Sequence, residues 1–376
     1  MNDQLAPRFK IEINGRDLAD TAPVAFSSIK RVMFEQAFFR TSRVEISFRD
    51  SENFDLTPEL TKLHSRLNLR MGYHGRLCEM FEGSLAGIEP SCEQGEPPTL
   101  VLKAYDYSHK LKVEPPNRIY KDNNLDNVVR KIIASHKDPA LKAEIERDSK
   151  LKAILPETDQ RVVQVSMTDW EVLTKAARLV NYKLFVEFDT VYLVSSDYLR
   201  KSSGIRYIYN ARKPDIEADK TAPILSFYPR LGFEDQRKTV EVVGWDAYKA
   251  KGIRYSKAEL EQIEKDSDLE GYTEISVIAS EKLVVNEVAK TDKQARDMAE
   301  AELRRRAEQL VRGDLTIIGD PEIELGEMLA LKINAFGRIG RQFSGEHQVA
   351  GIRNIITSTG YITEIDINRQ GLTEVS

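Results

Sequence analysis

The chain has 376 residues, of which 41% are hydrophobic and 31% charged, and its formal net charge is -5. This length predicts two or three domains, and the near balance of charge argues against a nucleic-acid binder. No apolar run approaches the roughly 18 residues of a membrane span, and no secretory signal is expected at the N-terminus. Two cysteines exclude a disulfide framework, so Cys78 and Cys92 are expected to be reduced thiols of a protein folded in a cytoplasm.

The first third of the chain alternates apolar and polar residues with the period of two that is typical of half-buried strands. Asn14-Gly15 supplies the positive-φ pair that a tight hairpin needs. The expected strands are residues 9–13, 43–49, 67–73, 79–88 and 99–105. Short strands separated by glycine and proline turns indicate a small barrel or sandwich. We expect this first β-barrel domain to occupy residues 1–115.

The next segment changes to a helical period. Apolar residues fall on one face of residues 125–133, and Thr168 and Glu171 have the spacing of a capping box that begins a second helix. A hairpin over residues 184–194 follows. We therefore expect a compact α/β domain over residues 116–205.

The last part of the chain returns to strands around a helical segment. Strands are expected at residues 224–228, 239–245, 328–333, 348–356 and 360–367. Residues 254–270 carry a charged run expected to be helical, and Thr291 with Gln294 forms a second capping box. The expected domains are a second β-barrel over 206–249 and 313–370, a charged helical insertion over 250–312 that packs with the α/β domain, and a tail over 371–376.

One internal repeat stands out. The order strand, glycine turn, Phe-x-Gly, Gly-Ile, strand occurs twice, over residues 69–105 and 331–367. The motif residues are Phe81-Glu82-Gly83 and Gly87-Ile88 in the first copy, and Phe343-Ser344-Gly345 and Gly351-Ile352 in the second. The shared order and spacing predict a duplicated β-module. Two similar barrels on one chain would allow three copies to form a ring with approximate sixfold symmetry.

The usual catalytic signatures are absent, including the nucleophile elbow, the zincin motif, the phosphate-binding loop and paired cysteines. Glu346-His347 lacks a second histidine and is interpreted as a surface pair on a strand. Carboxylates are abundant, but a sequence does not show which of them lie together. No catalytic, cofactor-binding or metal-binding residue is predicted, and no cofactor.

Three other features can be interpreted either as binding sites or as ordinary structural elements. Asp266–Gly271 resembles the start of a calcium loop, but Val277 occupies the place of its bidentate glutamate, which favours a solvated acidic turn over a cation site. Arg304–Arg306 lies among glutamates, which favours pairing on a solvated helix face over a grip on a partner's carboxylates. Trp170 and Trp245 are expected in domain cores rather than on a stacking platform.

The order of several motifs resembles the baseplate hub proteins of contractile tails, the phage late control D family. The motifs are Gln164–Leu173, Gly319–Gly326, Met328–Ile333, Phe343-Ser344-Gly345, Val349–Ile352 and Gly360–Thr363. The resemblance covers roughly residues 8–370, nearly the whole chain. It departs from the family at Glu346–Val349, where a tyrosine is usual, and at Asn354, where a histidine is frequent.

The resemblance implies a homotrimer in which each chain gives two barrels to a six-barrel ring that continues the hexameric tail tube. The segments 116–205 and 250–312 would form a wider collar, and a trimeric spike would dock on the other face. Related VgrG-type proteins continue into a spike where this sequence ends at Ser376, so the spike is expected on another chain. The lumen would pass DNA or protein cargo.

The implied partners are the chain itself, the spike protein, the tail tube protein and other baseplate proteins, without membrane insertion. Assembly is expected in the bacterial cytoplasm, as part of a phage tail baseplate or a contractile injection particle. The choice among phage tail, tailocin and injection system stays open. Two alternatives are a receptor- or carbohydrate-binding tail protein and a cell-wall-degrading tail enzyme.

Overall fold

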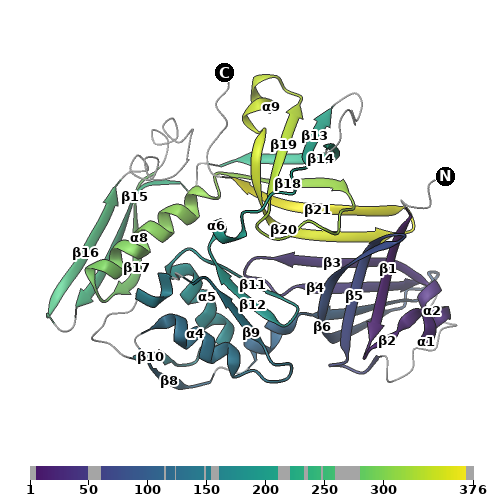
Figure 1. Ribbon diagram of the computed structural model, residues 1–376, viewed down its shortest axis with the longest axis horizontal. Helices are drawn as coiled ribbons and strands as arrows, with labels where there is room; N and C mark the ends of the chain where they lie inside the picture. Colours follow the sequence, from purple (N-terminus) through teal and green to yellow (C-terminus); the bar gives the residue numbers. More distant parts are fainter. Residues whose placement is uncertain are drawn as a thin grey trace.

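The computed structural model describes residues 6–49, 61–113, 116–122, 124–147, 150–153, 161–210, 221–232, 236–246, 249–258 and 280–369. The protein is mostly β, with 51% strand and 22% helix, and it contains a closed six-stranded barrel with additional strands. The expected fold class, α+β and mostly β, is confirmed. Figure 1 shows two β regions on one side of the molecule, and on the other an α/β unit and a small sheet beside α8.

The first β region, here called the first module, pairs its strands in the order β3-β4-β7-β6-β5-β1-β2. The strands are β1 (Pro7–Ile13), β2 (Arg16–Asp17), β3 (Ile29–Ala37), β4 (Arg43–Arg49), β5 (Arg66–Tyr73), β6 (Arg76–Ser91) and β7 (Thr99–Tyr105). Alternation decides which face is buried: in β4, Val44, Ile46 and Phe48 are fully buried, whereas the residues between them are not. The short helices α1 (Leu18–Thr21) and α2 (Pro23–Ser27) pack on the same core.

The second module is the closed barrel. Its strands are β13 (Arg206–Asn210), β14 (Thr221–Leu231), β18 (Val311–Ile318), β19 (Met328–Asn334), β20 (Gly345–Thr357) and β21 (Gly360–Arg369). They pair in the order β19-β13-β14-β18-β21-β20, and β20 pairs back to β19, which closes the ladder. A short helix, α9 (Arg338–Gln342), separates β19 from β20. The barrel has its own apolar core, which includes Leu315, Leu329, Ile352 and Ile365.

Five strands recur in the two modules with the same order and directions. In chain order, β3, β4, β5, β6 and β7 correspond to β14, β18, β19, β20 and β21, and the four antiparallel ladders of the first set each have a counterpart in the second. The first strands differ, because β1 is antiparallel to β5 whereas β13 is parallel to β19. Bulges coincide as well, which fixes the correspondence to the residue. They lie between Ile29 and Arg31 and between Ile224 and Ser226 in one pair of ladders, and between Leu85 and Gly87 and between Val349 and Gly351 in the other.

These registers support part of the sequence repeat and correct the rest. Gly87 corresponds to Gly351, as the Gly-Ile motif predicted. The Phe-x-Gly match was wrong, because Phe81 pairs with Leu69 and therefore corresponds to Gly345, which pairs with Leu331. The reason is α9: it delays the start of β20 and leaves Phe343 as the C-cap residue of that helix.

The long strand β20 joins the modules. Its first residues pair with β19 of its own barrel, and residues 351–357 pair with residues 31–37 of β3 in the first module. This ladder makes both modules part of one 13-stranded sheet. The connection between the modules is therefore a hydrogen-bonded strand pair rather than a flexible linker.

The α/β unit forms around two amphipathic helices and confirms the elements expected there. Its elements are η3 (Tyr107–Lys112), β8 (Arg118–Lys121), α4 (Leu125–Ala134), β9 (Lys142–Ile145), η4 (Lys150–Ala153), β10 (Arg161–Gln164), α5 (Asp169–Leu179), β11 (Lys183–Glu187), β12 (Thr190–Val194) and α6 (Ser196–Leu199). The capping box of Thr168 and Glu171 begins α5 as predicted. The apolar faces of α4 and α5 bury Val129, Ile132 and Leu173 in one core.

A third small sheet lies between β14 and β18 in the chain. Its strands are β15 (Arg237–Asp246), β16 (Lys251–Ala258) and β17 (Ser280–Ala289), and α8 (Asp292–Ala307) packs on it. The expectation of a helix from residue 254 was wrong for β16, which pairs with β15 along its whole length. For the same reason β15 belongs to this sheet and not to the second barrel. The expected domain boundaries otherwise stay a prediction.

Candidate functional site

Eight strands of the continuous sheet present a charged surface. In the order β14-β18-β21-β20-β3-β4-β7-β6 they cross both modules, and polar residues alternate with the side chains that face the two cores. We call this surface the charged face and define it by Arg230, Asp314, Glu364, Asp366, Arg353, Glu35, Arg43, Glu45, Lys103 and Glu89. It gathers ionisable groups from distant parts of the chain into one surface.

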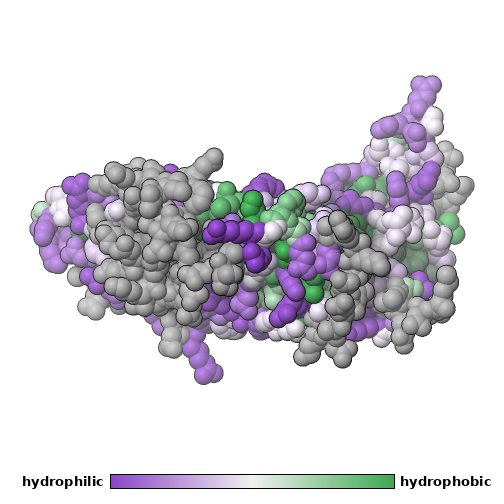
Figure 2. Space-filling model, turned by 90° about the horizontal axis from the view of Figure 1, so that it is seen from above, coloured by the Kyte–Doolittle hydropathy of each residue, from purple (hydrophilic) through white to green (hydrophobic). Residues whose placement is uncertain are grey.

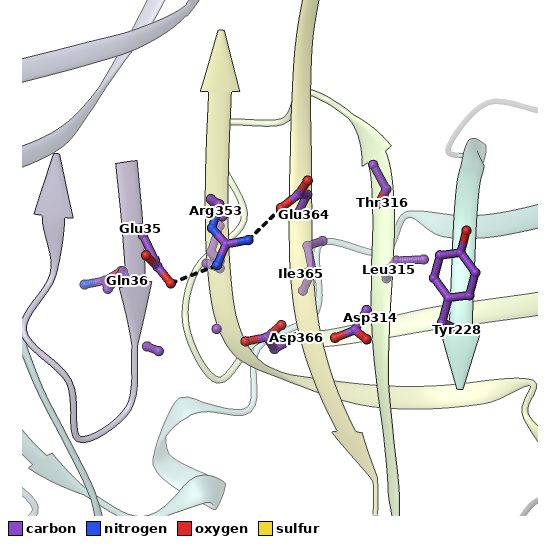
Figure 3. Close-up of a pocket in the computed structure, with 13 residues that line it drawn as sticks. Glu35, Gln36, Tyr228, Asp314, Leu315, Thr316, Arg353, Glu364, Ile365 and Asp366 are labelled. Atoms are coloured by element: carbon purple, nitrogen blue, oxygen red, sulfur yellow. Dashed lines mark hydrogen bonds and ion pairs between the residues drawn. The ribbon is translucent and has the colours of Figure 1, made fainter. Parts of the chain in front are cut away.

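The centre of the charged face is an ion-pair network across the junction of the modules. Arg353 in β20 donates to Glu35 in β3 over 3.0 Å and to Glu364 in β21 over 2.8 Å. Glu35 also accepts from Arg43 over 2.6 Å. Figure 3 shows Arg353 between the two carboxylates. Because the network links both modules, it reinforces the β20–β3 ladder, and networks contribute more than isolated surface pairs.

The pKa values of two carboxyl groups on this surface are shifted in opposite directions. Burial opposes ionisation of Glu35, but hydrogen bonds and charges from Arg353 and Arg43 outweigh it and lower the pKa of that carboxyl. Burial raises the pKa of Asp366, and the nearby carboxylate of Asp314 adds to the effect. Cross-module pairing thus stabilises the charge on Glu35, whereas no comparable pairing offsets the burial of Asp366.

Beside the network lies an open depression of about 270 Å³, lined by residues of β3, β14, β18, β20 and β21. Figure 3 shows Tyr228 at its far side, beyond Asp314 and Asp366. Pockets for small molecules are usually deeper, apolar cavities of about 300 to 1,000 Å³. The depression is instead a shallow part of a polar sheet surface, which suits contact with water or a macromolecule.

The α/β unit holds the sheet from the other side. Gln36, next to Glu35 in β3 and therefore on the opposite face, donates to the carbonyl oxygen of Val186. The main-chain nitrogen of Phe39 donates to Leu184, and the rings of Phe38 and Phe185 meet edge to face. The bulk of the α/β unit thus contacts the side away from the charged face.

A buried ion pair ties α8 to the same unit. Lys183 in β11 donates a hydrogen bond to Glu308 at the C-cap of α8. Each side chain is 8% exposed. Glu308 also accepts from Asn181 and Ser196. Removing one partner of such a pair would leave an uncompensated buried charge. The pair therefore fixes α8 against the α/β unit.

The residues considered from the sequence fall in separate places. His347 lies on a strand but inside the second barrel, fully buried, where burial lowers its pKa to about 3, so its interpretation as a surface residue was wrong. Trp170 is in the core of the α/β unit, as predicted, whereas Trp245 is 53% exposed and was predicted wrongly. Both cysteines are free, with Cys78 half-buried and Cys92 exposed.

The cluster Arg304–Arg306 shows the expected pairing with glutamates on a helix face only in part. Arg305 and Arg306 pair with Glu302 within α8 over 2.7 Å, in the spacing predicted for a helix face. Glu308 does not join them, because it is buried against Lys183. The acidic segment Asp266–Gly271 lies outside the described residues.

Within the described ranges, no group of three or more histidine, cysteine or carboxylate side chains could hold a metal ion. None of the helices in those ranges has both the length and the apolar character of a membrane span. Sequence reasoning found no member of the charged face. The only signal was the alternation of charged and apolar residues in strands such as β4.

The fold is shared with solved tail proteins. A 43 kDa tail protein of prophage MuSo2 from Shewanella oneidensis aligns with a TM-score of 0.69 at 12% identity, covering 97% of this chain and 98% of that one. A tail protein from Neisseria meningitidis gives 0.68 at 12% identity, with 97% of each chain covered. A component of the type VI secretion system of Escherichia coli gives 0.54 at 9% identity, covering 98% of this chain and 79% of that one.

No curated protein sequence matches this chain. A family model described as the Alg8 N-terminal domain matches residues 3–358. This match does not confirm the resemblance to the late control D family, which stays a prediction. Because the match spans nearly the whole sequence, the chain belongs to the family of the Alg8 N-terminal domain.

Proposed function

We propose that this chain is the structural hub of a contractile tail or injection machine, a homotrimer that joins a sixfold tail tube to a threefold spike. The observation that carries the proposal is the duplicated module, in which five strands recur in the same chain order and with the same ladders. Three copies would arrange six equivalent modules around an axis, although the chain itself repeats only three times. Such a molecule adapts one symmetry to the other.

The shared fold supports this role. The similar solved structures are described as tail proteins of prophages and a component of the type VI secretion system. A structural part is the counterpart that the shared fold of these tail and secretion proteins suggests. We infer the same non-enzymatic role here, in a virion or injection particle, with spike and tube proteins as neighbours.

The charged face is the surface we assign to the lumen. The sheet has one face on the module cores, and the α/β unit contacts that same side through Gln36. A ring of such sheets would turn the charged face toward its axis and place the α/β unit and α8 outside, as a collar. Carboxylates such as Glu364 and Asp314 would discourage the phosphates of DNA from binding during passage.

Native mass spectrometry of the purified chain, alone and with the spike protein, tests the proposal. A species of three times the chain mass of 42.8 kDa is expected, in at least one of the two samples. Trimers that appear only with the spike would mean that the spike templates assembly. A chain that stays monomeric in both samples would contradict the hub.

A further inference from the structure

The duplication leaves two strand edges unpaired. At the junction within the chain, residues 351–357 of β20 pair with residues 31–37 of β3. In the part of the chain that the structure describes, no strand pairs with the corresponding edges. These are residues 87–91 of β6, on the side away from β7, and residues 225–231 of β14, on the side away from β18. Open edges offer main-chain donors and acceptors to another chain.

The ladders show which residues of these edges correspond to the junction. Glu89 pairs with Val101 of β7, and in the second module Arg353 holds that place, opposite Glu364. By the same comparison, Arg230 of β14 holds the place of Glu35 in β3. The two positions that carry Arg353 and Glu35 at the junction therefore carry Glu89 and Arg230 at the open edges, with the charges exchanged.

We propose that the β6 edge of one copy lies against the β14 edge of a second copy, in the register of the β20–β3 junction, with Glu89 paired to Arg230 of the next copy. This seam rests on the proposed ring, whose three contacts between copies it would form. It is a head-to-tail contact between two different surfaces, and a contact of this kind closes into a ring when the rotation permits.

The exchanged charges select the partner edge. If β6 met the β3 edge of another copy, Glu89 would face Glu35. If β14 met a β20 edge, Arg230 would face Arg353. Both wrong contacts bring like charges together, whereas both right ones bring opposite charges together. Repulsion in the wrong contact gives specificity beyond the attraction in the right one.

The neighbouring charges extend the pattern. Glu89 already pairs with Lys103 over 2.7 Å, and Arg230 pairs with Asp314 over 2.5 Å. The side chains of Glu89 and Arg230 remain 58% and 74% exposed in one copy. Joining the edges would create a row of four alternating charges, Lys103, Glu89, Arg230 and Asp314, across the seam.

Apolar surface accompanies the β14 edge. A hollow of about 630 Å³ lies beside it, lined by Leu225, Phe227, Ile333, Phe336, Ile339 and Phe343 among others. Leu225 is 50% exposed and Phe336 is 82% exposed. Figure 2 shows hydrophobic side chains gathered in the middle of the face that carries α9 and β14. Two half-buried residues, Ile88 and Leu231, would lie opposite each other in the proposed register.

The same register places Pro90 opposite Pro229. Proline has no main-chain N–H and is confined to edge positions in sheets. The seam is therefore not a complete hydrogen-bonded ladder, and its side chains set the register. This arrangement also protects the free edges from pairing with unrelated strands before assembly.

A charge-reversal cycle tests the seam. We would compare wild type, Glu89→Arg, Arg230→Glu and the double variant by native mass over a dilution series. Each single reversal puts like charges together, so the concentration needed for trimers is expected to rise by at least about tenfold. The double variant restores an opposite pair and is expected to recover most of the assembly. Glu79→Arg is the matched control, because Glu79 lies on the same strand and pairs with Arg70 away from the seam.

The outcomes separate the seam from the ring. Trimers of wild type together with undisturbed single reversals would leave the hub standing and overturn the seam. Single reversals that fail without recovery in the double variant would overturn the Glu89–Arg230 pairing. Wild type that never assembles, alone or with the spike, would overturn both proposals.

A cysteine pair tests the register without changing charge. Directly opposite residues of two antiparallel strands lie about 5 Å apart, within disulfide reach. With Cys78 and Cys92 replaced by serine, Ser91→Cys and Tyr228→Cys together are expected to yield covalent trimers after mild oxidation. Each cysteine alone is the control. Monomers after oxidation of an assembled sample would overturn the register.

Discussion

The two β-modules share five strands in the same order and directions, but they differ in the direction of their first strand and close differently. In the second, β13 pairs with β14 and β19, so the ladder runs around the barrel without a gap. In the first, the described residues form no ladder between β1 and β3. The helices α1 and α2 pack there instead: Leu18 and Ala25 are buried in the core, and the rings of Phe9 and Phe26 are 5.3 Å apart.

This difference shows that side-chain packing can take the place of a ladder. A closed ladder pairs the main-chain groups of every strand, whereas an open, curled sheet needs other residues to cover its last apolar side chains. In the first module the helices α1 and α2, here called the plug, cover them. What the modules keep in common is the set of strands β3-β4-β7-β6 and β14-β18-β21-β20, which carries the charged face. The shared part is the one that the ring would use, and the divergent part lies away from it.

The largest effect on stability is expected from a substitution in the plug formed by α1 and α2. Leu18 is fully buried in the first core, so Leu18→Ala should lower the free energy of unfolding by about 2 to 5 kcal/mol, measured by urea unfolding. Val24→Ala is the control, because Val24 on α2 is 59% exposed and should change little. Equal midpoints for the two variants would mean that α1 does not close the first module.

A smaller effect on stability is expected from alanine substitutions at two corresponding glycines, Gly351 and Gly87. A methyl group on Gly351 would lie 2.8 Å from a carboxylate oxygen of Asp366, which can turn away, and 3.3 Å from the Cβ of Ala37, so Gly351→Ala should cost about 1 kcal/mol. At Gly87 the nearest atom is 3.5 Å away, an ordinary contact, so Gly87→Ala should be nearly neutral. Chemical denaturation of both variants measures the contrast, and a Gly87→Ala loss as large as that of Gly351→Ala would refute it.

The smallest effect concerns the loss of stability at acid pH through Glu35. The pKa of Glu35 is lowered in the folded protein, so its contribution to stability is present at neutral pH and is lost as the pH falls below its ordinary value near 4.5. Glu35→Gln should remove about 1 kcal/mol at pH 7 and flatten the loss of stability at acid pH. Urea midpoints at pH 7 and pH 4 provide the test. An unchanged pH profile in the variant would show that the junction does not depend on this charge.

Local patterns predicted the elements that local forces decide. The alternation in β4, the capping box at Thr168 and the helix start at Thr291 were correct because each depends on residues close in the chain. The capping box at Thr291 is formed only in part, because the Gln294 side chain accepts from the main-chain nitrogen of Lys290 rather than from that of Thr291. The strand β16 was missed because its charged residues suit a solvated helix equally well, and only pairing with β15 decides between the two.

The charged face lay beyond sequence reasoning for a different reason. Arg353 and Glu35 are 318 residues apart and meet only because β20 extends past its own barrel to β3. His347 was interpreted as a surface residue once a zinc motif was excluded, whereas the barrel buries it as a neutral ring. Repeated glycines indicated the duplication, but only the bulges fixed its register and exposed the exchange of charge between Arg353 and Glu89.

Electron-microscopy averages of the assembled hub, viewed along its axis, test the central claim most directly. The account predicts a ring of six similar lobes around an open lumen, alternating between closed and plugged modules so that the true symmetry is threefold. A closed particle without a lumen, or a ring whose neighbouring lobes are joined by any edges other than β20 with β3 and β6 with β14, would contradict it.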